Sequence, residues 1–180
     1  MTRPKIAITV LSYQSADHIA ECVESVLAQT ASGLALSVVD NASTDGSAEI
    51  VGERCPRVRI MRNRTNLGFA KAHNRMIAQT RADYYMPLNA DCRLAPEFVE
   101  RLLRTTEEEG AAYGTGKLLF SSTHPPYRIY STGHMLLRDG TVCNRGYGEE
   151  DRGAYDRRET VWGANGAAPI YSMRMLRELS

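Results

Sequence analysis

Residues 83–91, which read DYYMPLNAD, are the stretch that decides the fold. This apolar and aromatic run is too short for a helix, and it ends in two polar side chains, Asn89 and Asp91. Residues i and i+2 of a β-strand point the same way, so both should project from the carboxyl end of one buried strand. Ligands bind at that edge of open α/β sheets, and a carboxylate with an amide suits a divalent cation completed by phosphate oxygens. The simpler interpretation is a strand end whose polar residues cap a turn.

Outward from this stretch, short apolar runs alternate with amphipathic segments. One segment places its apolar residues at i, i+3, i+4, i+7 and i+8, which predicts a helix that buries Ile19, Cys22, Val23, Val26 and Leu27. The alternation predicts an α/β fold, a three-layer α/β/α sandwich with a mostly parallel central sheet. The other expected strands lie near residues 6–11, 34–39, 58–61 and 112–120, with a helix between each strand and the next.

The pattern changes after residue 120. Segments 130–137 and 141–144 flank an Asp-Gly dipeptide, which is typical of a β-hairpin turn. Residues 146–159 carry glycine and charges of both signs, and we interpret them as a mobile surface loop. A last strand is expected over 161–171, followed by a helix. The length of 180 residues fits a single domain.

Composition excludes several classes of protein. The net charge is +1, so no strong field draws the chain to nucleic acid or to an anionic membrane. The four cysteines form no Cys-x-x-Cys pair, which favours reduced thiols in a cytoplasmic protein and argues against structural zinc. No apolar run is long enough to span a bilayer, and residues 1–4 lead directly into a strand without a signal peptide. We therefore expect a cytoplasmic protein without a transmembrane segment or a nucleic-acid partner.

The common phosphate-binding signatures are missing from the sequence. It has no P-loop, and the loop after the first strand lacks the glycines of a dinucleotide-binding fold. The four histidines show no pairing with a nucleophile. Three predicted strands nevertheless end in polar loops, at residues 9–13, 40–45 and 89–91, and these loops would meet at one edge of the sheet. There Asp40 could accept the imide N–H of uracil or thymine, while Asn89 and Asp91 hold a ribose and a metal that activates a diphosphate leaving group.

The same loops carry a resemblance to a known family. The segments that carry it are VLSY at 10–13, DNASTDGS at 40–47, NLGFAKAHN at 66–74, LNAD at 88–91 and GANGA at 163–167. As an ordered set they closely resemble the family 2 glycosyltransferases, enzymes of the GT-A fold. The Leu-Asn-x-Asp form is similar to a rhamnosyltransferase-like branch. The resemblance implies inverting transfer of a sugar from a nucleotide-diphosphate donor, a dTDP- or UDP-sugar with dTDP-rhamnose as one candidate, assisted by Mg²⁺ or Mn²⁺.

The resemblance also implies roles for individual residues. Asp91 should ligate the metal, Asp40 should contact the nucleobase, and Asn89 should face the ribose or diphosphate. Thr9 and Ser12 should border the nucleotide pocket. The remaining implied positions lie beneath the pocket or near the donor sugar and acceptor, and they are Asn66, Gly68, Asn74, Trp162, Gly163 and Ala164. Backbone geometry is the alternative role for the glycines, and helix packing is the alternative for Asn74.

Two departures from the family pattern stand out. Asn89 replaces the first Asp of the commoner Asp-x-Asp motif, which lowers the charge of the site. The family normally continues to a Glu-Asp motif whose Asp is the general base. The 180 residues of this sequence contain no counterpart of that motif. Residues 1–120 would then form the nucleotide-sugar-binding half, and 121–180 the start of an incomplete acceptor-side half. We accordingly predict a truncated chain with no catalytic residue of its own, in which donor binding persists and transfer is poor or absent.

Further expectations concern partners and alternatives. The acceptor would be a glycan or a lipid-linked sugar in cell-surface polysaccharide synthesis. Peripheral association with the inner face of the membrane and formation of a homodimer are both compatible with the sequence. A non-catalytic nucleotide-sugar-binding module is one alternative. A sugar-nucleotide nucleotidyltransferase is another, although residues 11–15 lack the glycine and basic residues that such enzymes carry.

Overall fold

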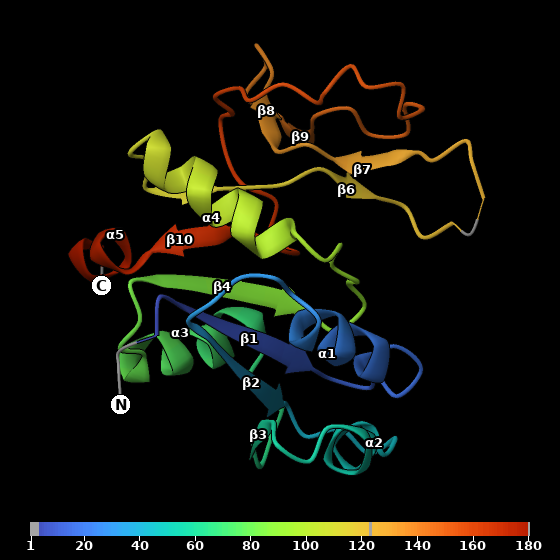
Figure 1. Ribbon diagram of the computed structural model, residues 1–180, viewed down its shortest axis with the longest axis vertical. Helices are drawn as coiled ribbons and strands as arrows, with labels where there is room; N and C mark the ends of the chain where they lie inside the picture. The colour runs from blue at the N-terminus through green and yellow to red at the C-terminus, as the bar shows by residue number, and fades with distance from the viewer. Residues whose placement is uncertain (1–3, 123, 180) are drawn as a thin grey trace.

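A central six-stranded sheet organises the computed structural model, which describes residues 4–122 and 124–179. The strand order is β3-β2-β1-β4-β10-β5 (Figure 1). The first four strands in that order run parallel, and β10 is antiparallel to both of its neighbours. The expected mostly parallel sheet is therefore confirmed. Its strands are β1 (Ile6–Ser12), β2 (Leu34–Asp40), β3 (Arg59–Arg62), β4 (Tyr84–Asn89), β5 (Tyr113–Gly114) and β10 (Ile170–Ser172).

Helices cover both faces of the sheet and complete the three layers (Figure 1). α1 (Ile19–Leu27), α2 (Ser47–Arg54) and α4 (Phe98–Glu108) supply buried side chains to the larger core cluster. α3 (Phe69–Gln79) and α5 (Met173–Glu178) pack with the smaller cluster on the opposite face. The side chains of β1 alternate between the two clusters, as the pleat of a strand requires. Leu27, predicted to be buried, is instead 54% exposed because it lies in the last turn of α1.

The register of the parallel strands brings their polar ends to one edge of the sheet. Ser12 pairs with Asp40 across β1 and β2, and Leu11 pairs with Asn89 across β1 and β4. The chain order reverses at β1, since β2 and β3 lie on one side of it and β4 lies on the other. Ligands of open α/β sheets bind at such a reversal, outside the carboxyl ends of the strands. The predicted meeting of the three polar loops is confirmed.

The strand predicted over 112–120 is broken into β5 and β6 (Leu118–Leu119), which belong to different sheets. Close approach of α4 explains the break. A Cβ at Gly116 would lie 2.4 Å from the Phe98 ring, and one at Gly114 would lie 2.6 Å from the Thr106 hydroxyl oxygen. Only glycine fits there, and it weakens a strand. The last strand was predicted over residues 161–171. It is also shorter than expected, because the strand that joins the sheet here is β10, which begins at Ile170.

Two small antiparallel pairs form the upper part of the molecule in Figure 1: β6 with β7 (Ile129–Ser131), and β8 (His134–Leu136) with β9 (Val142–Asn144). The β8–β9 hairpin confirms the Asp-Gly turn signal. The strand predicted over 130–137 is interrupted at Gly133, where φ is +112° and a Cβ would lie 2.9 Å from Val161. The loop interpreted as mobile is fastened by Lys117, whose ammonium lies 2.8 Å from Asp151 and 2.6 Å from Asp156.

Candidate functional site

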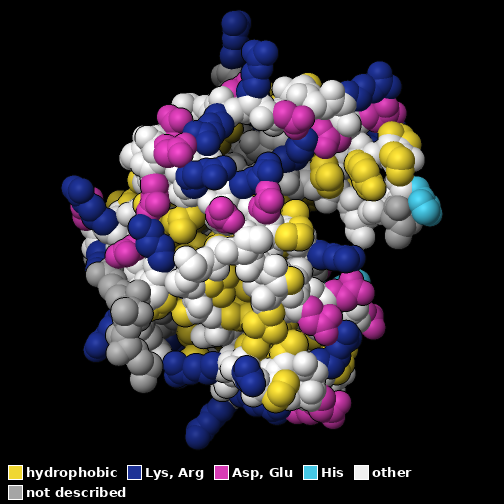
Figure 2. Space-filling view, viewed as in Figure 1, with side chains coloured by type: hydrophobic (Ala, Val, Ile, Leu, Met, Phe, Trp, Pro, Cys, Tyr) yellow, Lys and Arg dark blue, Asp and Glu magenta, His cyan; other side chains and the backbone are white. Residues whose placement is uncertain are grey.

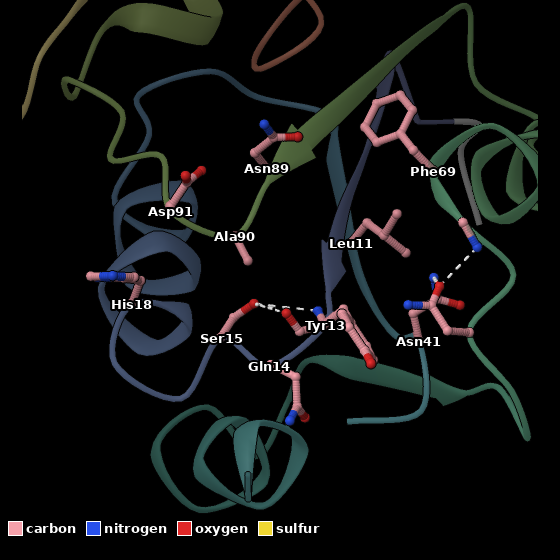
Figure 3. Close-up of a pocket in the computed structure, with 12 residues that line it drawn as sticks. Leu11, Tyr13, Gln14, Ser15, His18, Asn41, Phe69, Asn89, Ala90 and Asp91 are labelled. Carbon is pink, nitrogen blue, oxygen red and sulfur yellow. Dashed lines mark hydrogen bonds between the residues drawn. The ribbon is translucent and has the colours of Figure 1, made fainter. Parts of the chain in front are cut away.

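A cavity of about 430 Å³ opens at the carboxyl ends of β1, β2 and β4, where the strand order reverses (Figure 3). Side chains from the loop after β1, the start of α1 and the start of α3 complete its wall. The lining residues are Leu11, Tyr13, Gln14, Ser15, His18, Asn41, Asn66, Gly68, Phe69, Asn89, Ala90 and Asp91. The cavity contains four of the predicted site residues, Asn66, Gly68, Asn89 and Asp91.

The loop after β1 is fixed to the loop after β2 by Gln14. Its backbone N–H donates to the Ser43 hydroxyl at 3.2 Å, and its side-chain oxygen accepts the Thr44 backbone N–H at 2.7 Å. Gln14 has a φ of 52°, a conformation that is uncommon outside glycine. The contacts with the second loop compensate for this strain and hold the rim of the cavity in one arrangement.

A second set of contacts extends the same attachment. The Ser15 N–H donates to the Ser47 hydroxyl at 3.0 Å, and the Ala16 N–H donates to Asp45 Oδ2 at 2.8 Å. The Ser47 hydroxyl in turn donates to Asp45 Oδ1. That hydroxyl, together with backbone N–H donors, lowers the pKa of the Asp45 carboxyl, so Asp45 is held as the anion that accepts these bonds. The serine and acidic residues of the DNASTDGS segment thus shape the cavity rim without lining it.

Asn41 joins the end of β2 to the start of α3. Its side-chain nitrogen donates to Asn66 Oδ1 at 2.7 Å, and its side-chain oxygen accepts from Asn63 Nδ2 and from the Leu67 N–H, both at 3.0 Å. Asn66 Oδ1 also accepts the Gly68 N–H at 2.8 Å. Gly68 has a φ of 74° and open space around it, so backbone conformation explains the glycine. Asn41 was not among the predicted site residues, although its buried amide connects the two loops.

Asp40 lies immediately before Asn41 and is 4% exposed. Its Oδ1 accepts the Ser43 N–H at 3.1 Å. The backbone turns sharply at Ala42, where φ is 68°. The structure thus places Asp40 at the buried inner edge of the cavity beside a lining residue, and its predicted contact with a nucleobase stays a prediction.

Thr9 and Ser12 are buried and are not among the lining residues. Three positions apart on β1, they point to opposite faces of the sheet. Thr9 bonds to the Tyr85 phenol, a contact that partly opposes the rise in the Tyr85 pKa caused by burial. Within the described residues the Ser12 hydroxyl has no hydrogen-bond partner. Asn74 is exposed and also lies outside the lining.

A buried histidine supports one wall of the cavity from beneath. His73 Nδ1 lies 2.8 Å from the Tyr85 hydroxyl, and the His73 ring contacts the Phe69 ring with 4.4 Å between centroids. Burial lowers the pKa of His73 to about 4, so its imidazole is neutral at pH 7. Phe69 lines the cavity and is half exposed. The Phe69 ring therefore packs on a neutral, buried imidazole. His73 is not a lining residue of the cavity, so its position does not support a catalytic role.

Asn89 ends β4 and Asp91 follows it, and the two side chains extend in the same general direction, as predicted (Figure 3). His18, at the start of α1, lines the same cavity, which sequence analysis missed. Burial, with a contribution from Asp91, raises the pKa of the Cys92 thiol to about 12, so this cysteine is unreactive at neutral pH. The described residues contain no cluster of three or more His, Cys, Asp or Glu that could hold a metal. The donor set instead fits a metal held by one carboxylate and completed by phosphate oxygens.

Trp162, Gly163 and Ala164 lie apart from this cavity. The His134 N–H donates to the Gly163 carbonyl at 2.7 Å, and the Tyr113 hydroxyl donates to the Trp162 carbonyl at 3.1 Å. The same segment contacts β4 at Ala167, whose carbonyl accepts the Asn89 N–H at 3.0 Å. The bridge between His134 of β8 and Gly163 holds this segment away from the loops that line the cavity.

A family model described as "Glycosyl transferase family 2" matches residues 7–178. The chain belongs to glycosyl transferase family 2. Chondroitin synthase of Pasteurella multocida is 29% identical over 147 residues, and the alignment covers 80% of this chain and 14% of that protein. Glycosyltransferase GlyG of Streptococcus pneumoniae is 27% identical over 132 residues, covering 71% of this chain and 44% of its relative. The chain thus spans less than half the length of these curated relatives.

Solved structures with the same fold include S. aureus TarS 1–349 in complex with UDP-GlcNAc, with a TM-score of 0.64 and 17% identity over 97% of this chain and 47% of that one. A mannosyltransferase from Pyrobaculum calidifontis, in complex with GDP-Man and Mn²⁺, has a TM-score of 0.57 and 22% identity over 65% of this chain and 36% of that one. The predicted family and its GT-A fold are confirmed. The rhamnosyltransferase-like branch stays a prediction.

No helix in the described part of this family 2 chain has the length and hydropathy needed to cross a membrane.

Proposed function

We propose that this chain binds a nucleotide-diphosphate sugar in the cavity at the carboxyl ends of β1, β2 and β4, and that it serves inverting transfer of the sugar to an acceptor hydroxyl. The observation that carries the proposal is the convergence of Asn41, Asn89 and Asp91 on one cavity at the reversal of the strand order. Membership of family 2 supports the same reaction class.

The nucleoside end of the donor fits the side of the cavity formed by β2 and α3. The buried Asp40 carboxylate suits the imide N–H of uracil or thymine. The Phe69 ring offers an apolar face to a base or ribose, and its contact with His73 limits its rotation. The Asn41–Asn66 pair holds both loops at the correct separation before any ligand arrives.

The diphosphate end fits the side formed by β4 and α1. Asp91 would ligate Mg²⁺ or Mn²⁺, with Asn89 and His18 available to the phosphate and ribose oxygens. When bound, such an ion neutralises the charge that develops on the departing nucleoside diphosphate. Because the protein supplies one carboxylate in place of two, more of the ion's ligands must come from the phosphate oxygens of the donor. Metal and donor are therefore expected to bind together.

In the transfer step, the acceptor oxygen forms a bond to the anomeric carbon as the bond from that carbon to the diphosphate breaks. The acceptor proton passes to a general base. The donor would be a UDP- or dTDP-sugar, with dTDP-rhamnose as one candidate, and the acceptor a glycan or a lipid-linked sugar. Relatives named for chondroitin, hyaluronan and succinoglycan support a role in polysaccharide synthesis.

Release of nucleoside diphosphate separates a transferase from a non-catalytic nucleotide-sugar-binding module. The chain would be incubated with Mn²⁺ and UDP-GlcNAc, dTDP-rhamnose or GDP-mannose, with water as the acceptor, and the released nucleoside diphosphate would be measured. Slow release that is lost in Asp91→Asn supports the transferase. Tight binding of a donor without release supports the module, and binding of none of the three would refute the assigned cavity.

A further inference from the structure

Three exposed aromatic rings form a cluster outside the donor cavity. The ring of Phe120 lies 5.4 Å from those of Tyr130 and Tyr147, and the two tyrosine rings lie 6.0 Å apart, all tilted or edge to face. The three side chains are 38%, 36% and 60% exposed, in the order just named. We call these residues the aromatic platform. Rings that hold one another at an exposed surface form a rigid contact area, which commonly marks an interaction site.

The backbone is built to present these rings. Ile129 and Ser131 of β7 are buried, so the alternation of the strand turns Tyr130 outward. Tyr147 lies between two glycines, Gly146 and Gly148, with φ values of 77° and 78°. A side chain at Gly146 would place its Cβ 3.0 Å from the Tyr155 ring, whereas Gly148 has open space. Both glycines are needed for the path that brings Tyr147 beside the other two rings.

Local hydrogen bonds fix the three segments side by side. The Phe120 N–H donates to the Arg128 carbonyl at 2.9 Å, and the Ile129 N–H donates to the Glu149 carbonyl at 2.8 Å. The Gly148 N–H donates to the Ile129 carbonyl at 2.8 Å. The platform therefore sits on a bonded antiparallel layer and needs no ordering before it meets a partner.

The charges around the platform are balanced. Arg128 and Arg152 both pair with Glu150, and Glu149 accepts the Tyr155 hydroxyl at 3.1 Å. A rim with equal numbers of positive and negative groups does not attract an anionic membrane or a nucleic acid. Within the described part of the chain, the hydroxyls of Tyr130 and Tyr147 have no hydrogen-bond partner. Apolar ring faces edged with free hydroxyls and paired charges match a sugar ring, whose C–H face is apolar and whose rim carries hydroxyls.

The location of the platform agrees with this chemistry. Hydrophobic side chains gather over the β6–β7 hairpin, and the outline of the molecule is indented between this hairpin and the body below it (Figure 2). The hairpin projects in the direction in which the carboxyl ends of β1 and β4 point (Figure 1). We propose that the aromatic platform binds a glycan chain through sugar residues that do not react, an inference that rests on the proposed function.

The test uses a printed array of bacterial polysaccharide fragments that includes hyaluronan and chondroitin octasaccharides. The wild type would be compared with Tyr147→Ala and Tyr147→Phe, and with Leu137→Ala as a control, since Leu137 is an exposed apolar residue outside the platform. We expect at least one glycan to bind, with a loss of about tenfold or more in Tyr147→Ala, a smaller loss in Tyr147→Phe and no loss in Leu137→Ala. Thermal unfolding of each variant would verify that it folds.

Three results would overturn the proposal. They are an array without any bound glycan, glycan binding that survives Tyr147→Ala, and a ring-dependent association with phosphatidylglycerol vesicles or with a second copy of the chain. Titration with UDP, dTDP and GDP keeps this outcome separate from the proposed function. The platform variants should bind nucleotide as the wild type does, so nucleotide binding without glycan binding refutes only the platform.

Discussion

The side-chain nitrogen of Asn41 donates a hydrogen bond to Oδ1 of Asn66 at 2.7 Å, which joins the end of β2 to the start of α3 in the wall of the cavity. We predict that Asn41→Ala destabilises the chain by about 1–3 kcal/mol, because the Leu67 N–H loses its partner and two further contacts disappear. It should also weaken nucleotide binding. Urea unfolding and nucleotide titration would measure both effects. Asn74→Ala is the matched control, since Asn74 is exposed, and a loss as large in the control would contradict the account.

The attachment between the loops after β1 and β2 predicts a local change in dynamics. In Ser47→Ala the Ser15 N–H loses its acceptor, and Asp45 loses the hydroxyl that favours its anion. We expect faster hydrogen exchange at residues 14–16 and weaker nucleotide binding, with exchange in the central strands unchanged. Hydrogen-exchange mass spectrometry would measure this change. Ser122→Ala, in an exposed turn, should leave residues 14–16 as they are, and unchanged exchange in Ser47→Ala would disprove the attachment.

His73 predicts a pH dependence of stability. Burial lowers its pKa to about 4 from an ordinary value near 6.5, so between these values the unfolded chain binds more protons than the folded one. Stability should therefore fall as the pH drops from 7 towards 4, by at most about 3 kcal/mol from this group. Urea unfolding at several pH values would measure the slope. His73→Gln should flatten it, whereas the exposed His124→Gln should retain it, and equal slopes in all three chains would rule out His73 as the cause.

Two glycines offer a matched test of packing between α4 and the sheet. A Cβ at Gly114 would lie 2.6 Å from the Thr106 hydroxyl, 3.1 Å from Leu102 and 3.2 Å from Ile170. Gly114→Ala should thus destabilise the chain by about 1–3 kcal/mol through overpacking. Gly166 has an ordinary φ and open space around its Cβ position, so Gly166→Ala should be neutral or slightly stabilising. Thermal unfolding would compare the two, and equal stability would show that the contact with α4 relaxes freely.

Sequence alone could predict the sheet because local pattern determines it. The apolar runs of β1, β2 and β4 and their polar ends predicted a parallel core and a shared edge, which the pairing of Leu11 with Asn89 bears out. The prediction of one strand over 112–120 was wrong. Its glycines are required by close contact with Phe98 and Thr106, which lie elsewhere in the chain. The predicted burial of Leu27 was wrong, because helical spacing does not show where the end of a helix leaves the core.

The site was less predictable for the same reason. Asn89, Asp91 and Asn66 could be located because each lies at the end of a strand or in a loop next to a strand or helix. Ser12 ends β1 at the edge and Thr9 lies three residues earlier, and the burial of both depends on packing against the layers on either side of the sheet. His18 joins the cavity only through the position of α1, so no local signal relates it to Asp91.

The central claim is that Asp91 and a divalent cation bind a nucleoside diphosphate in this cavity. The direct test is calorimetric titration of UDP, dTDP and GDP, with and without Mn²⁺, into the wild type, Asp91→Asn and the control Asp139→Asn, which alters the distant β8–β9 turn. The account predicts that Mn²⁺ tightens binding of at least one nucleotide by about tenfold or more in the wild type and the control, and that Asp91→Asn loses this gain. An equal response to Mn²⁺ in all three chains, or no binding of any nucleotide, would contradict it.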